Sequence, residues 1–353
     1  MTGRFAPSPT GRMHLGNVYA MLAAWLQSRH SQQSIVLRIE DIDTPRVKPH
    51  AVEWICEDLQ WLGLNWNGDI TFQSQRTALY ELALQVLQEQ TVECFADGQY
   101  VELPLVYPCY CSRAQIQASA PHSEDGILKY AGTCRKYAYK SANMHNNCEH
   151  VQRDIMSKRH SWRIVAPDKV LSFQDEIFGL QTFNLYKDIG DTVICRSDGL
   201  FSYQLVVVVD DLLMGVDNIV RGRDLLRFTA LQIWIRNRLI QGHFIERAFD
   251  NGYVETCNSS SQQVTYAHIP LLCSTQGERL AKRKHDMDLG KLREYGISRE
   301  AIVGFCAYAL GLIPSLETIS AQELISLYSA EKIANNIEDV YLPDNIIDVL
   351  KNM

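Results

Sequence analysis

One stretch near the N-terminus, residues 3–17, constrains the fold more than any other part of the chain. It begins as a short apolar segment, is broken by Pro7, Pro9 and Gly11, and then enters a segment with helical periodicity. A strand, a loop of small residues and a helix N-terminus place backbone N–H groups where they face an anion, usually a phosphate. His14 stands at this helix entrance, where an imidazole can donate to phosphate oxygens as charge builds on them. The stretch therefore predicts an α/β fold with a phosphate-binding loop.

A second interpretation explains the same residues. A proline-rich turn can simply join a strand to a helix, with His14 as an ordinary helix cap, because isolated turns of small residues are weak signals. Gly16 supports the first interpretation, the phosphate-binding loop, because a residue without a side chain lets a nucleotide ring lie close to the backbone. The local geometry alone leaves the two interpretations about equal, so the rest of the chain has to decide.

Length and composition narrow the class of protein. A chain of 353 residues, 46% of them hydrophobic, is long enough for about two or three packed domains. No run approaches the ~20 apolar residues of a membrane span, and a strand that starts by Arg4 leaves no room for a signal peptide. We therefore expect a cytoplasmic protein without a membrane partner. A net charge of −7 argues against indiscriminate binding of nucleic acid, although a local basic patch can still bind RNA.

Acidic residues follow the next predicted strand. Residues 34–39 are typical of a buried parallel strand, and Glu40, Asp41 and Asp43 come directly after it. In a doubly wound sheet, ligands bind at the carboxyl ends of the strands. Asp43 also precedes Pro45, and aspartate is a favoured helix-capping residue, so a helix cap explains part of this acidic pattern. Helices are expected over residues 49–62 and 74–90.

The second half of the sheet is expected to resume at residues 162–165. Residues 173–179 indicate a hairpin, and residues 201–211 form the most strand-like run in the chain, ending at paired aspartates. Tyr203 lies in that run and Arg221 follows it. A lone tyrosine in a strand is usually part of the core, and a lone arginine usually faces solvent.

Between these halves lies a polar segment that contains three cysteines in an unusual arrangement. Cys109, Cys111 and Cys134 offer three thiolates, whereas zinc takes four ligands. The spacing is not the C-x₂-C of a zinc ribbon. Zinc and unlinked core cysteines therefore remain equally good interpretations of the spacing. Other donors compete for the fourth position: His122, His145, Cys148 and His150.

The order of these motifs resembles that of class I glutamyl-tRNA synthetases. The resemblance rests on residues 4–11 (RFAPSPTG) with 14–17 (HLGN), on residues 38–43 (RIEDID), and on the basic segment 279–283 (RLAKR). Taken alone, that last segment would be interpreted as a solvated loop. The resemblance implies a class I Rossmann-type doubly wound parallel sheet with an inserted zinc-binding subdomain and a C-terminal helical region. It implies four parts: two halves of the catalytic domain at 1–105 and 161–242, the insert at 106–160, and the lysine loop with helices at 243–353.

The resemblance also implies roles for individual residues. Glu40 would contact the ammonium group of the amino acid, and arginine suits its carboxylate because the guanidinium can bind both oxygens. The catalytic residues would be His14 and Lys282, and magnesium would accompany ATP. Ala281 departs from the hydroxyl residue usual in this loop. The implied glutamate-binding residues are Arg4, Phe5, Ala6, Pro7, Ser8, Glu40, Tyr203 and Arg221, and the implied ATP-binding residues are His14, Gly16, Asn17 and Lys282.

Two further features resemble one family within this group, the glutamyl-Q tRNA(Asp) synthetases. One is the pattern Cys-x-Cys followed by Tyr-x₃-Cys, although the gap before the tyrosine looks longer than usual. The other is the short segment of 71 residues from Arg283, which leaves no room for an anticodon-binding domain. The resemblance implies one structural zinc and transfer of ATP-activated glutamate to queuosine at the wobble position of tRNA(Asp). The implied zinc ligands are Cys109, Cys111, Tyr130 and Cys134.

Within this resemblance, the chain would act as a monomer that binds the anticodon arm of tRNA(Asp). Three other functions remain open at this point. One is a truncated glutamyl-tRNA synthetase that charges tRNA(Glu), and another is a nucleotidyltransferase that uses the same loop. The third is an inactive RNA-binding paralogue.

Overall fold

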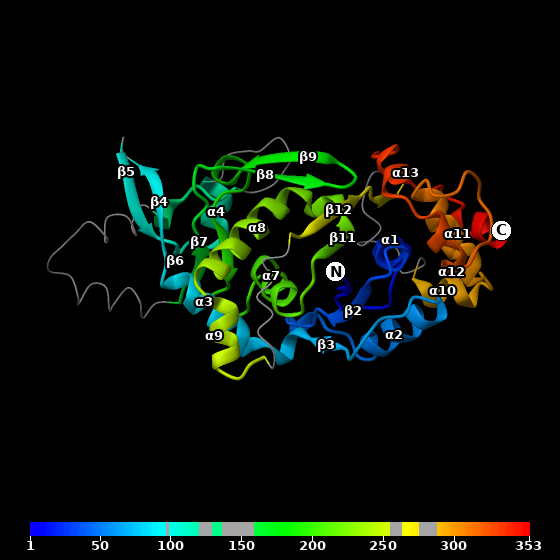
Figure 1. Ribbon diagram of the computed structural model, residues 1–353, viewed down its shortest axis with the longest axis horizontal. Coiled ribbons are helices and arrows are strands. Elements are labelled where there is room, and N and C mark those ends of the chain that lie inside the picture. The colour runs from blue at the N-terminus through cyan, green and yellow to red at the C-terminus, as the bar shows by residue number, and fades with distance from the viewer. Residues whose placement is uncertain (97–98, 120–128, 136–158, 255–262, 275–287) are drawn as a thin grey trace.

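The computed structural model describes residues 1–96, 99–119, 129–135, 159–254, 263–274 and 288–353 of an elongated molecule (Figure 1). Its strands are β1 (Thr2–Phe5), β2 (Ser34–Ile39), β3 (Thr71–Phe72), β4 (Thr91–Ala96), β5 (Gln99–Pro104), β6 (Val106–Cys109), β7 (Ser161–Ile164), β8 (Val170–Asp175), β9 (Gly179–Asn184), β10 (Thr192–Cys195), β11 (Asn218–Gly222), β12 (Thr265–Ile269), β13 (Leu272–Cys273) and β14 (Val340–Tyr341).

Its helices are α1 (Leu15–His30), α2 (Ala51–Trp61), α3 (Thr77–Gln88), α4 (Arg113–Ser119), α7 (Tyr203–Leu213), α8 (Leu226–Gln241), α9 (Phe244–Asp250), α10 (Leu289–Glu294), α11 (Arg299–Ala309), α12 (Ala321–Leu324), α13 (Ala330–Ala334) and α14 (Ile346–Lys351). Short 3-10 turns lie at Thr44–Arg46, Gln73–Gln75, Arg223–Leu225 and Ile325–Leu327, and a π-helical turn at Leu185–Ile189.

The predicted parallel sheet is confirmed, and it positions the candidate site. β1 pairs in parallel with β2 and β2 with β3, while β11 pairs in parallel with β12 and β12 with β8. β1 and β11 lie side by side, where the backbone N–H of Asp217 donates to the carbonyl oxygen of Thr2 (3.1 Å). Placed side by side at β1 and β11, the sheets β3-β2-β1 and β11-β12-β8-β9 give the order of a doubly wound sheet, which binds ligands at the carboxyl ends of its strands.

Helix α1 packs closely on this sheet. A Cβ atom added at Gly3 of β1 would lie 2.2 Å from the Ser28 hydroxyl of α1, so a side chain there would displace that hydroxyl from its hydrogen bond to Ala24. The predicted helical face of α1 is buried, as are the apolar residues predicted for α3. The predicted hairpin near residues 173–179 is formed by β8 and β9. The local pattern was therefore sufficient for these elements.

Residues 201–211, the most strand-like run in the sequence, form a helix, and that prediction is wrong. Helix α7 begins at Tyr203 and contacts α3 and α8, so that Leu205 to Leu212 are buried almost without interruption. A segment that is apolar on every side has no period of two or of 3.6, and periodicity cannot tell a buried helix from a buried strand. The preference of valine against helix is worth less than about 0.7 kcal/mol per residue, which packing overrides.

The prediction that the parallel sheet resumes at Trp162 is also wrong. This segment forms β7, which pairs antiparallel with β6 on one side and β10 on the other. β6 begins the polar insert and β7 follows it, so their pairing closes the base of the insert. Strands joined by such a connection pair with each other before they pair with a distant parallel sheet. The predicted domain boundaries at residues 105, 160 and 242 stay a prediction.

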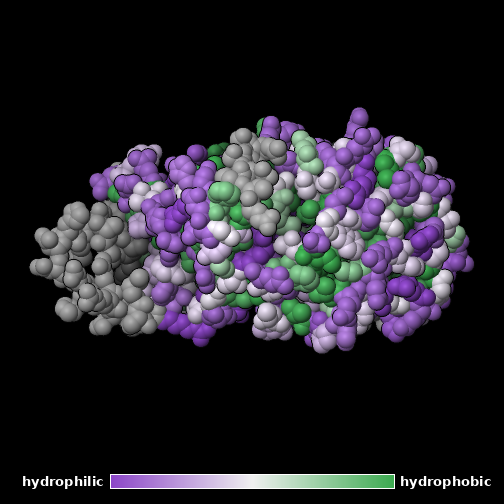
Figure 2. Space-filling view, turned by 60° about the horizontal axis from the view of Figure 1, so that its bottom comes forward, coloured by the Kyte–Doolittle hydropathy of each residue, from purple (hydrophilic) through white to green (hydrophobic). Residues whose placement is uncertain are grey.

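Two hydrophobic cores hold the molecule together. The first combines apolar residues of segments 5–64 and 289–350 with five from the middle of the chain (Ile177, Val220, Ala267, Ile269 and Leu272), and the second lies within segment 79–266, around α3, α7 and α8. Both termini of the described chain therefore contribute to one core. The face shown in Figure 2 is mainly hydrophilic, with hydrophobic residues gathered toward its middle. No helix in the described ranges is long and apolar enough to cross a membrane.

Candidate active site and cysteine cluster

The loop between β1 and α1 ends in a helix cap made by His14. Nδ1 of His14 accepts from the backbone N–H of Asn17 (3.3 Å), and Oδ1 of Asn17 accepts from the backbone N–H of His14 (3.1 Å). His14 is thus a helix cap, as the second interpretation predicts, but this does not exclude a phosphate-binding loop. With Nδ1 accepting, the ring proton lies on Nε2, which remains a donor. Burial lowers the pKa of His14, so the ring is neutral near pH 7.

The basic segment predicted to meet ATP lies outside the described residues, and so does Lys282 within it. The first described residue after it, Asp288, forms an antiparallel bridge with His14. The backbone N–H of Leu289 then donates to the carbonyl oxygen of Met13 (2.8 Å). The chain therefore returns to the phosphate loop directly after this segment. Gly16 lies in the first turn of α1, half-buried, beside Asn17.

A cavity of about 250 Å³ opens at the carboxyl end of β2 and at the start of α7. It contains three of the predicted glutamate-binding residues, whereas Arg4 and Arg221 are not among the residues that line it. The carbonyl oxygen of Pro7 accepts from the backbone N–H of Glu40 (2.9 Å), which holds the loop against β2. The lining residues are Ser8, Pro9, Thr10, Glu40, Ile42, Asp43, Arg46, Val47, Gln73, Arg196, Leu200, Phe201, Ser202, Tyr203 and Val206.

Glu40 is the most unusual carboxylate of this cavity. Its side chain is 8% exposed, and its Oε1 lies 3.4 Å from Nη2 of Arg38. Burial raises the pKa of Glu40 to about 7, against the opposing effects of Arg38 and Arg4. Near neutral pH this group therefore exchanges a proton readily, and a cation placed beside it would favour the carboxylate. Asp43, the alternative cap, precedes a 3-10 turn but makes no capping hydrogen bond through its side chain.

An arginine–carboxylate cluster lies behind Glu40; we define it as Arg4, Arg38, Glu40, Asp210 and Asp211. The fully buried Arg38 donates through Nη1 to Oδ1 of Asp211 (2.6 Å), and its Nε lies 3.7 Å from Oδ2 of Asp210. Nε of Arg4 lies 3.5 Å from Oδ1 of Asp211. Burial acts to raise the pKa of Asp211, but Arg38 and Arg4 hold it below its usual value. Asp210 also accepts hydrogen bonds from Gln73, Arg76 and Tyr80.

Two predicted arginines lie within electrostatic reach of Tyr203. Arg4 donates through Nη1 to the carbonyl oxygen of Val220 (3.1 Å), so it joins β1 to β11. Burial and the Glu40 carboxylate raise the pKa of Tyr203, while Arg221 and Arg4 act to lower it. Of the remaining predicted residues, Phe5 is buried at the end of β1 and Ala6 is half-buried.

Arg221 is buried and leaves one nitrogen without a partner. Its Nε donates to Nε2 of His268 (3.0 Å) and its Nη2 to the hydroxyl of Thr229 (2.7 Å). Its Nη1 makes no hydrogen bond to any described residue. Buried guanidinium nitrogens are nearly always satisfied. Among the described residues, however, an unpaired buried nitrogen also occurs at Arg4, Arg38, Arg76, Arg163 and Arg238, so at Arg221 it leaves a donor available for an oxygen ligand without by itself identifying one.

Several residues of this site escaped the sequence analysis. Arg38, Asp175 and His268 are buried and make the shortest polar contacts of the region. A signal existed for Arg38, because an arginine inside an otherwise apolar strand must find a buried partner. His268 lies in the similar apolar run of β12, where one polar residue among buried neighbours is equally unusual.

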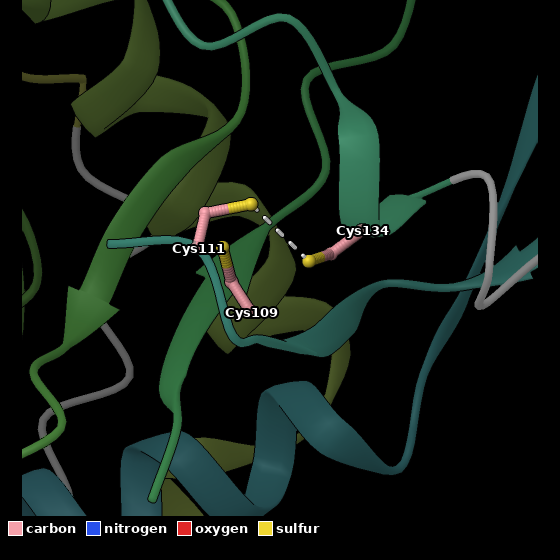
Figure 3. Close-up of side chains that lie close together, drawn as sticks. All are labelled: Cys109, Cys111 and Cys134. Atoms are coloured by element: carbon pink, nitrogen blue, oxygen red, sulfur yellow. Dashed lines mark hydrogen bonds between the residues drawn. The ribbon is translucent and has the colours of Figure 1, made fainter. Parts of the chain in front are cut away.

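The three cysteines of the polar insert converge (Figure 3). Cys109 ends β6, Cys111 follows two residues later, and Cys134 comes from the described segment 129–135. Their sulfur atoms all lie within 4.8 Å of one another, and those of Cys111 and Cys134 are 3.5 Å apart. Tetrahedral zinc, with Zn–S bonds of about 2.3 Å, places sulfur atoms about 3.8 Å apart. We call these three residues the cysteine cluster.

Tyr130 adds an oxygen to this cluster. Its Oη lies 3.4 Å from Sγ of Cys109 and 3.5 Å from Sγ of Cys111, and it accepts from the backbone N–H of Cys134 (2.8 Å). The alternative donors His122, His145, Cys148 and His150 lie outside the described residues. Among the candidate fourth donors, Tyr130 is the one that lies in the described residues, and its oxygen completes a set of four donor atoms.

Arg163 of β7 supplies positive charge beside the cysteine cluster. Its guanidinium lies 3.9 Å from the ring centroid of Tyr130. Hydrogen bonding with the Cys134 thiol, and then with Tyr130 and Arg163, lowers the pKa of Cys109, whereas burial raises the pKa of Tyr130. The cluster therefore favours a thiolate at Cys109, the form in which cysteine binds metals. These donor atoms fit a zinc ion in number, type and spacing.

Comparison with known proteins assigns this chain to a family. The family model of class I tRNA synthetases (E and Q), catalytic domain, matches residues 1–341. Proteins named glutamyl-Q tRNA(Asp) synthetase from Nitratidesulfovibrio vulgaris and Symbiobacterium thermophilum are 36% and 38% identical to this chain; each match covers 99% of the chain and 98% of the relative.

Solved structures agree with this assignment at the level of the fold. A glutamate tRNA ligase from Elizabethkingia meningosepticum in complex with its amino acid has a TM-score of 0.70 at 21% identity, covering 99% of this chain and 68% of that one. A glutamate-tRNA synthetase from Elizabethkingia anophelis gives the same TM-score and covers 69% of its chain. The chain therefore belongs to the glutamyl-Q tRNA(Asp) synthetase family of class I tRNA synthetases.

Proposed function

We propose that this enzyme activates L-glutamate with ATP and transfers the glutamyl group to queuosine at the wobble position of tRNA(Asp). One observation carries the proposal: relatives that match the chain over 98% of their own length bear the name of that activity. The arrangement of charge in the site supports it. A buried carboxylate at Glu40 and a buried arginine with a free nitrogen at Arg221 suit the opposite charges of an amino acid with an acidic side chain.

We assign the amino acid to the region between Glu40, Tyr203 and Arg221. Glu40 holds the ammonium group of the substrate, and Arg221 and Arg4 hold carboxylate oxygens. Ser8 and Tyr203, which line the cavity, donate hydroxyl hydrogen bonds. Phe5, Ala6 and Pro7 hold Ser8 in position through their backbone, since the carbonyl oxygen of Pro7 accepts from the backbone N–H of Glu40. Glutamine lacks the second carboxylate, so the site discriminates against it.

The chemistry is two displacements. The α-carboxylate of glutamate attacks the α-phosphorus of ATP, which gives glutamyl-adenylate and releases pyrophosphate. A hydroxyl of queuosine then attacks the acyl carbon, which releases AMP. Neither step needs a nucleophilic side chain, so the protein acts by positioning and by stabilising charge.

The residues at the start of α1 serve the first displacement. The Nε2–H of His14 donates to the phosphates, with Gly16 and Asn17 in the first turn of α1 beside them. Lys282 supplies the second cation, consistent with the return of the chain to His14 at Asp288. Magnesium binds the phosphate oxygens of ATP.

We propose that Cys109, Cys111, Cys134 and Tyr130 hold one structural zinc. The zinc neutralises the thiolates and the phenolate and joins β6 to the segment that contains Cys134. In this role it takes no part in the transfer. The RNA partner is the anticodon arm of tRNA(Asp), bound mainly through phosphates, so affinity falls as salt increases. The enzyme acts as a monomer in the cytoplasm, where ATP and tRNA occur together.

Exchange of labelled pyrophosphate into ATP without RNA tests the first step. Glutamate should support exchange, and glutamine and aspartate should support much less. Arg221→Ala should raise the KM for glutamate about a hundredfold and leave the KM for ATP unchanged, because an arginine–carboxylate pair contributes about 3 kcal/mol. Equal exchange with glutamine would contradict carboxylate recognition.

Transfer of labelled glutamate tests the second step. The acceptors are tRNA(Asp) with and without queuosine, each before and after periodate oxidation of its terminal ribose, with the queuosine ring protected during oxidation. Transfer that requires queuosine and survives oxidation supports the proposal. Transfer to unmodified tRNA(Glu) that oxidation abolishes would instead identify a glutamyl-tRNA synthetase.

A further inference from the structure

A chain of buried polar contacts runs through the sheet behind Arg221. Asp175 ends β8, His268 lies in β12, Arg221 in β11, and Thr229 in α8. Asp175, His268 and Thr229 have no exposed surface, and Arg221 is 6% exposed. The strands that carry the first three residues are neighbours in the sheet (Figure 1). Residues from four elements therefore form a continuous set of buried polar groups around Arg221.

The hydrogen bonds along this chain have a fixed direction. Oδ2 of Asp175 lies 2.6 Å from Nδ1 of His268. Oδ1 of Asp175 accepts from the backbone N–H groups of Ile177 (3.1 Å) and Phe178 (2.9 Å), and Oδ2 accepts from the backbone N–H of His268 (3.2 Å), so both oxygens act as acceptors. A carboxylate can only accept, so Nδ1 carries the ring proton and Nε2 presents a lone pair. That lone pair accepts from Nε of Arg221.

His268 has to stay neutral for this arrangement to hold. The charged or polar groups that face it are Asp175 from β8, Arg221 from β11, Thr229 from α8 and, farther away, Arg4 from β1. Burial, together with Arg221 and Arg4, lowers the pKa of His268 to about 4 against the effect of Asp175. Near pH 7 the imidazole is thus an acceptor toward Arg221 rather than a second cation.

Thr229 fixes the other side of the guanidinium. Its hydroxyl oxygen accepts from Nη2 of Arg221, which can only donate, and the hydroxyl proton faces two acceptors, the carbonyl oxygen of Leu225 (3.2 Å) and Nε2 of His268 (3.1 Å). With Nε and Nη2 both engaged, the plane of the guanidinium cannot rotate. Nη1 is left as the nitrogen without a partner among the described residues.

We propose that Asp175 and His268 are positioning residues that hold Arg221 so that its Nη1 meets the side-chain carboxylate of glutamate. Asp175 sets the tautomer of His268, His268 sets the plane of Arg221, and Arg221 contacts the substrate. This inference rests on the proposed function, in which Arg221 binds glutamate. It assigns selectivity for glutamate to two residues that do not touch it.

Substitution of Asp175 tests the tautomer directly. In Asp175→Asn the side-chain oxygen can still accept from Ile177 and Phe178, but the amide then donates to Nδ1 of His268. The ring proton moves to Nε2, where it opposes the N–H of Arg221. We expect the KM for glutamate in pyrophosphate exchange to rise about tenfold to a hundredfold, with kcat and the KM for ATP within about twofold. The preference for glutamate over glutamine should fall by a similar factor.

Two substitutions of His268 separate hydrogen bonding from packing. His268→Phe keeps a ring but removes the acceptor, and it should raise the KM for glutamate as much as Asp175→Asn does. His268→Gln can place its carbonyl oxygen near the position of Nε2 and should recover most of the affinity. Equal defects in the two variants would show that the ring matters only for packing, and this would overturn the proposal.

Asp191→Asn is a matched control in the other half of the molecule. Asp191 is also buried and accepts from Tyr107 (2.6 Å) and from the backbone N–H of Ala166 (2.8 Å). This variant should lower the melting temperature and leave the KM for glutamate unchanged. If Arg221→Ala raises the KM for glutamate while folded Asp175→Asn and His268→Phe do not, the positioning role is wrong and the proposed function stands. If Arg221→Ala itself has no effect, the assignment of Arg221 to glutamate is wrong.

A measurement on the unmodified enzyme covers the case in which the variants do not fold. Histidine labelled with ¹⁵N distinguishes the two neutral tautomers and the imidazolium by the chemical shifts of the ring nitrogens. We expect His268 to be neutral with its proton on Nδ1 at pH 7. A proton on Nε2, or an imidazolium at pH 7, would overturn the proposal.

Discussion

The molecule contains two buried polar clusters that are stabilised in different ways. In the arginine–carboxylate cluster, ion pairs as short as 2.6 Å join side chains from two strands and a helix. In the cysteine cluster, the contacts between sulfur and oxygen and between two of the sulfurs are 3.4–3.5 Å long, and Cys111 lies outside regular elements. The first cluster compensates its own charges, whereas the second collects donor atoms that have no cation among the described residues other than Arg163 at its side.

This difference shows how each cluster is kept in shape. Arginine and carboxylate are opposite charges, so the protein alone can hold the first cluster in position. Thiolates repel one another, so the second cluster depends on what it binds. Damage to the first should therefore spread through the active site and the core, while damage to the second should stay near the insert.

The largest effect is expected for Arg38→Met. Arg38 is fully buried against Asp210 and Asp211, and its loss would leave their negative charges uncompensated. We expect the free energy of unfolding to fall by about 3–5 kcal/mol, measured by urea denaturation. The control is Arg247→Ala, which breaks an exposed pair with Glu89 and should cost less than about 1 kcal/mol. Similar losses of unfolding free energy in the two variants would contradict the claim that the arginine–carboxylate cluster is held in shape by its own charges.

Removal of metal should have the next largest effect. We expect about one zinc per chain, lost on treatment with a strong chelator or in Cys111→Ser. A ligand present at about 100 times its Kd stabilises the folded state by about 3 kcal/mol, and this amount should be lost. Hydrogen exchange should increase in segments 106–111 and 129–135, and not in α1 or β2. Metal that persists after substitution of both Cys109 and Cys111 by serine would locate the site elsewhere, with His145 and His150 as candidates.

The pH dependence of glutamate binding should be moderate and should depend on Glu40. Its pKa of about 7 means that the carboxylate becomes protonated as the pH falls through 7, and a neutral acid cannot pair with the substrate ammonium. We expect affinity to fall about tenfold for each pH unit below 7 and to level off above it. Isothermal titration between pH 5.5 and 8.5 measures this, within the range expected to be tolerated by the fold.

The same group gives the opposite sign for stability. The folded state holds the Glu40 proton more tightly than the unfolded state does, because the folded pKa lies above the usual 4.5. Its contribution to the free energy of unfolding is complete below pH 4.5 and is lost as the pH rises through 7. Glu40→Gln should remove both dependences together. If only one of them disappears, Glu40 is not their common source.

The smallest effect is expected for Tyr130→Phe. Thiolates dominate a zinc site, so loss of one phenol oxygen should weaken metal binding by about 1 kcal/mol and retain most of the zinc. Competition with a chromogenic chelator gives the change in affinity. Complete loss of zinc would mean that Tyr130 is as important as the cysteines and that the cluster is less tolerant than proposed.

The part of the fold that depends on local pattern could be predicted from the sequence. β1, the loop and α1 follow from prolines, glycines and an apolar periodicity within about one turn of each other. Helix α7 could not be predicted in this way, because its apolar run carries no period once it is buried on every side. The separate sheet of β6, β7 and β10 depends on pairing across the insert, which no local pattern records.

The candidate site divides in the same way. His14 stands at the start of α1 and Glu40 directly after β2, positions that their sequence context indicates. Asp175 and His268 act across 93 residues of chain, and nothing near either residue in the sequence points to the other. Their partnership depends on the order of strands in the sheet. The approach of Tyr130 to two cysteines agrees with the family resemblance, whereas the position of Lys282 stays a prediction.

The shared core of segments 5–64 and 289–350 has a consequence for the making of the enzyme. During synthesis on the ribosome, segment 79–266 can complete its own core as soon as it leaves the exit tunnel. Helix α1 cannot, because the side that faces α11 and α12 has nothing to pack against until those helices are translated. In the nascent chain, segment 79–266 can therefore be folded while the loop before α1 is not. We expect the ability to consume ATP to appear only after α11 and α12 have been translated.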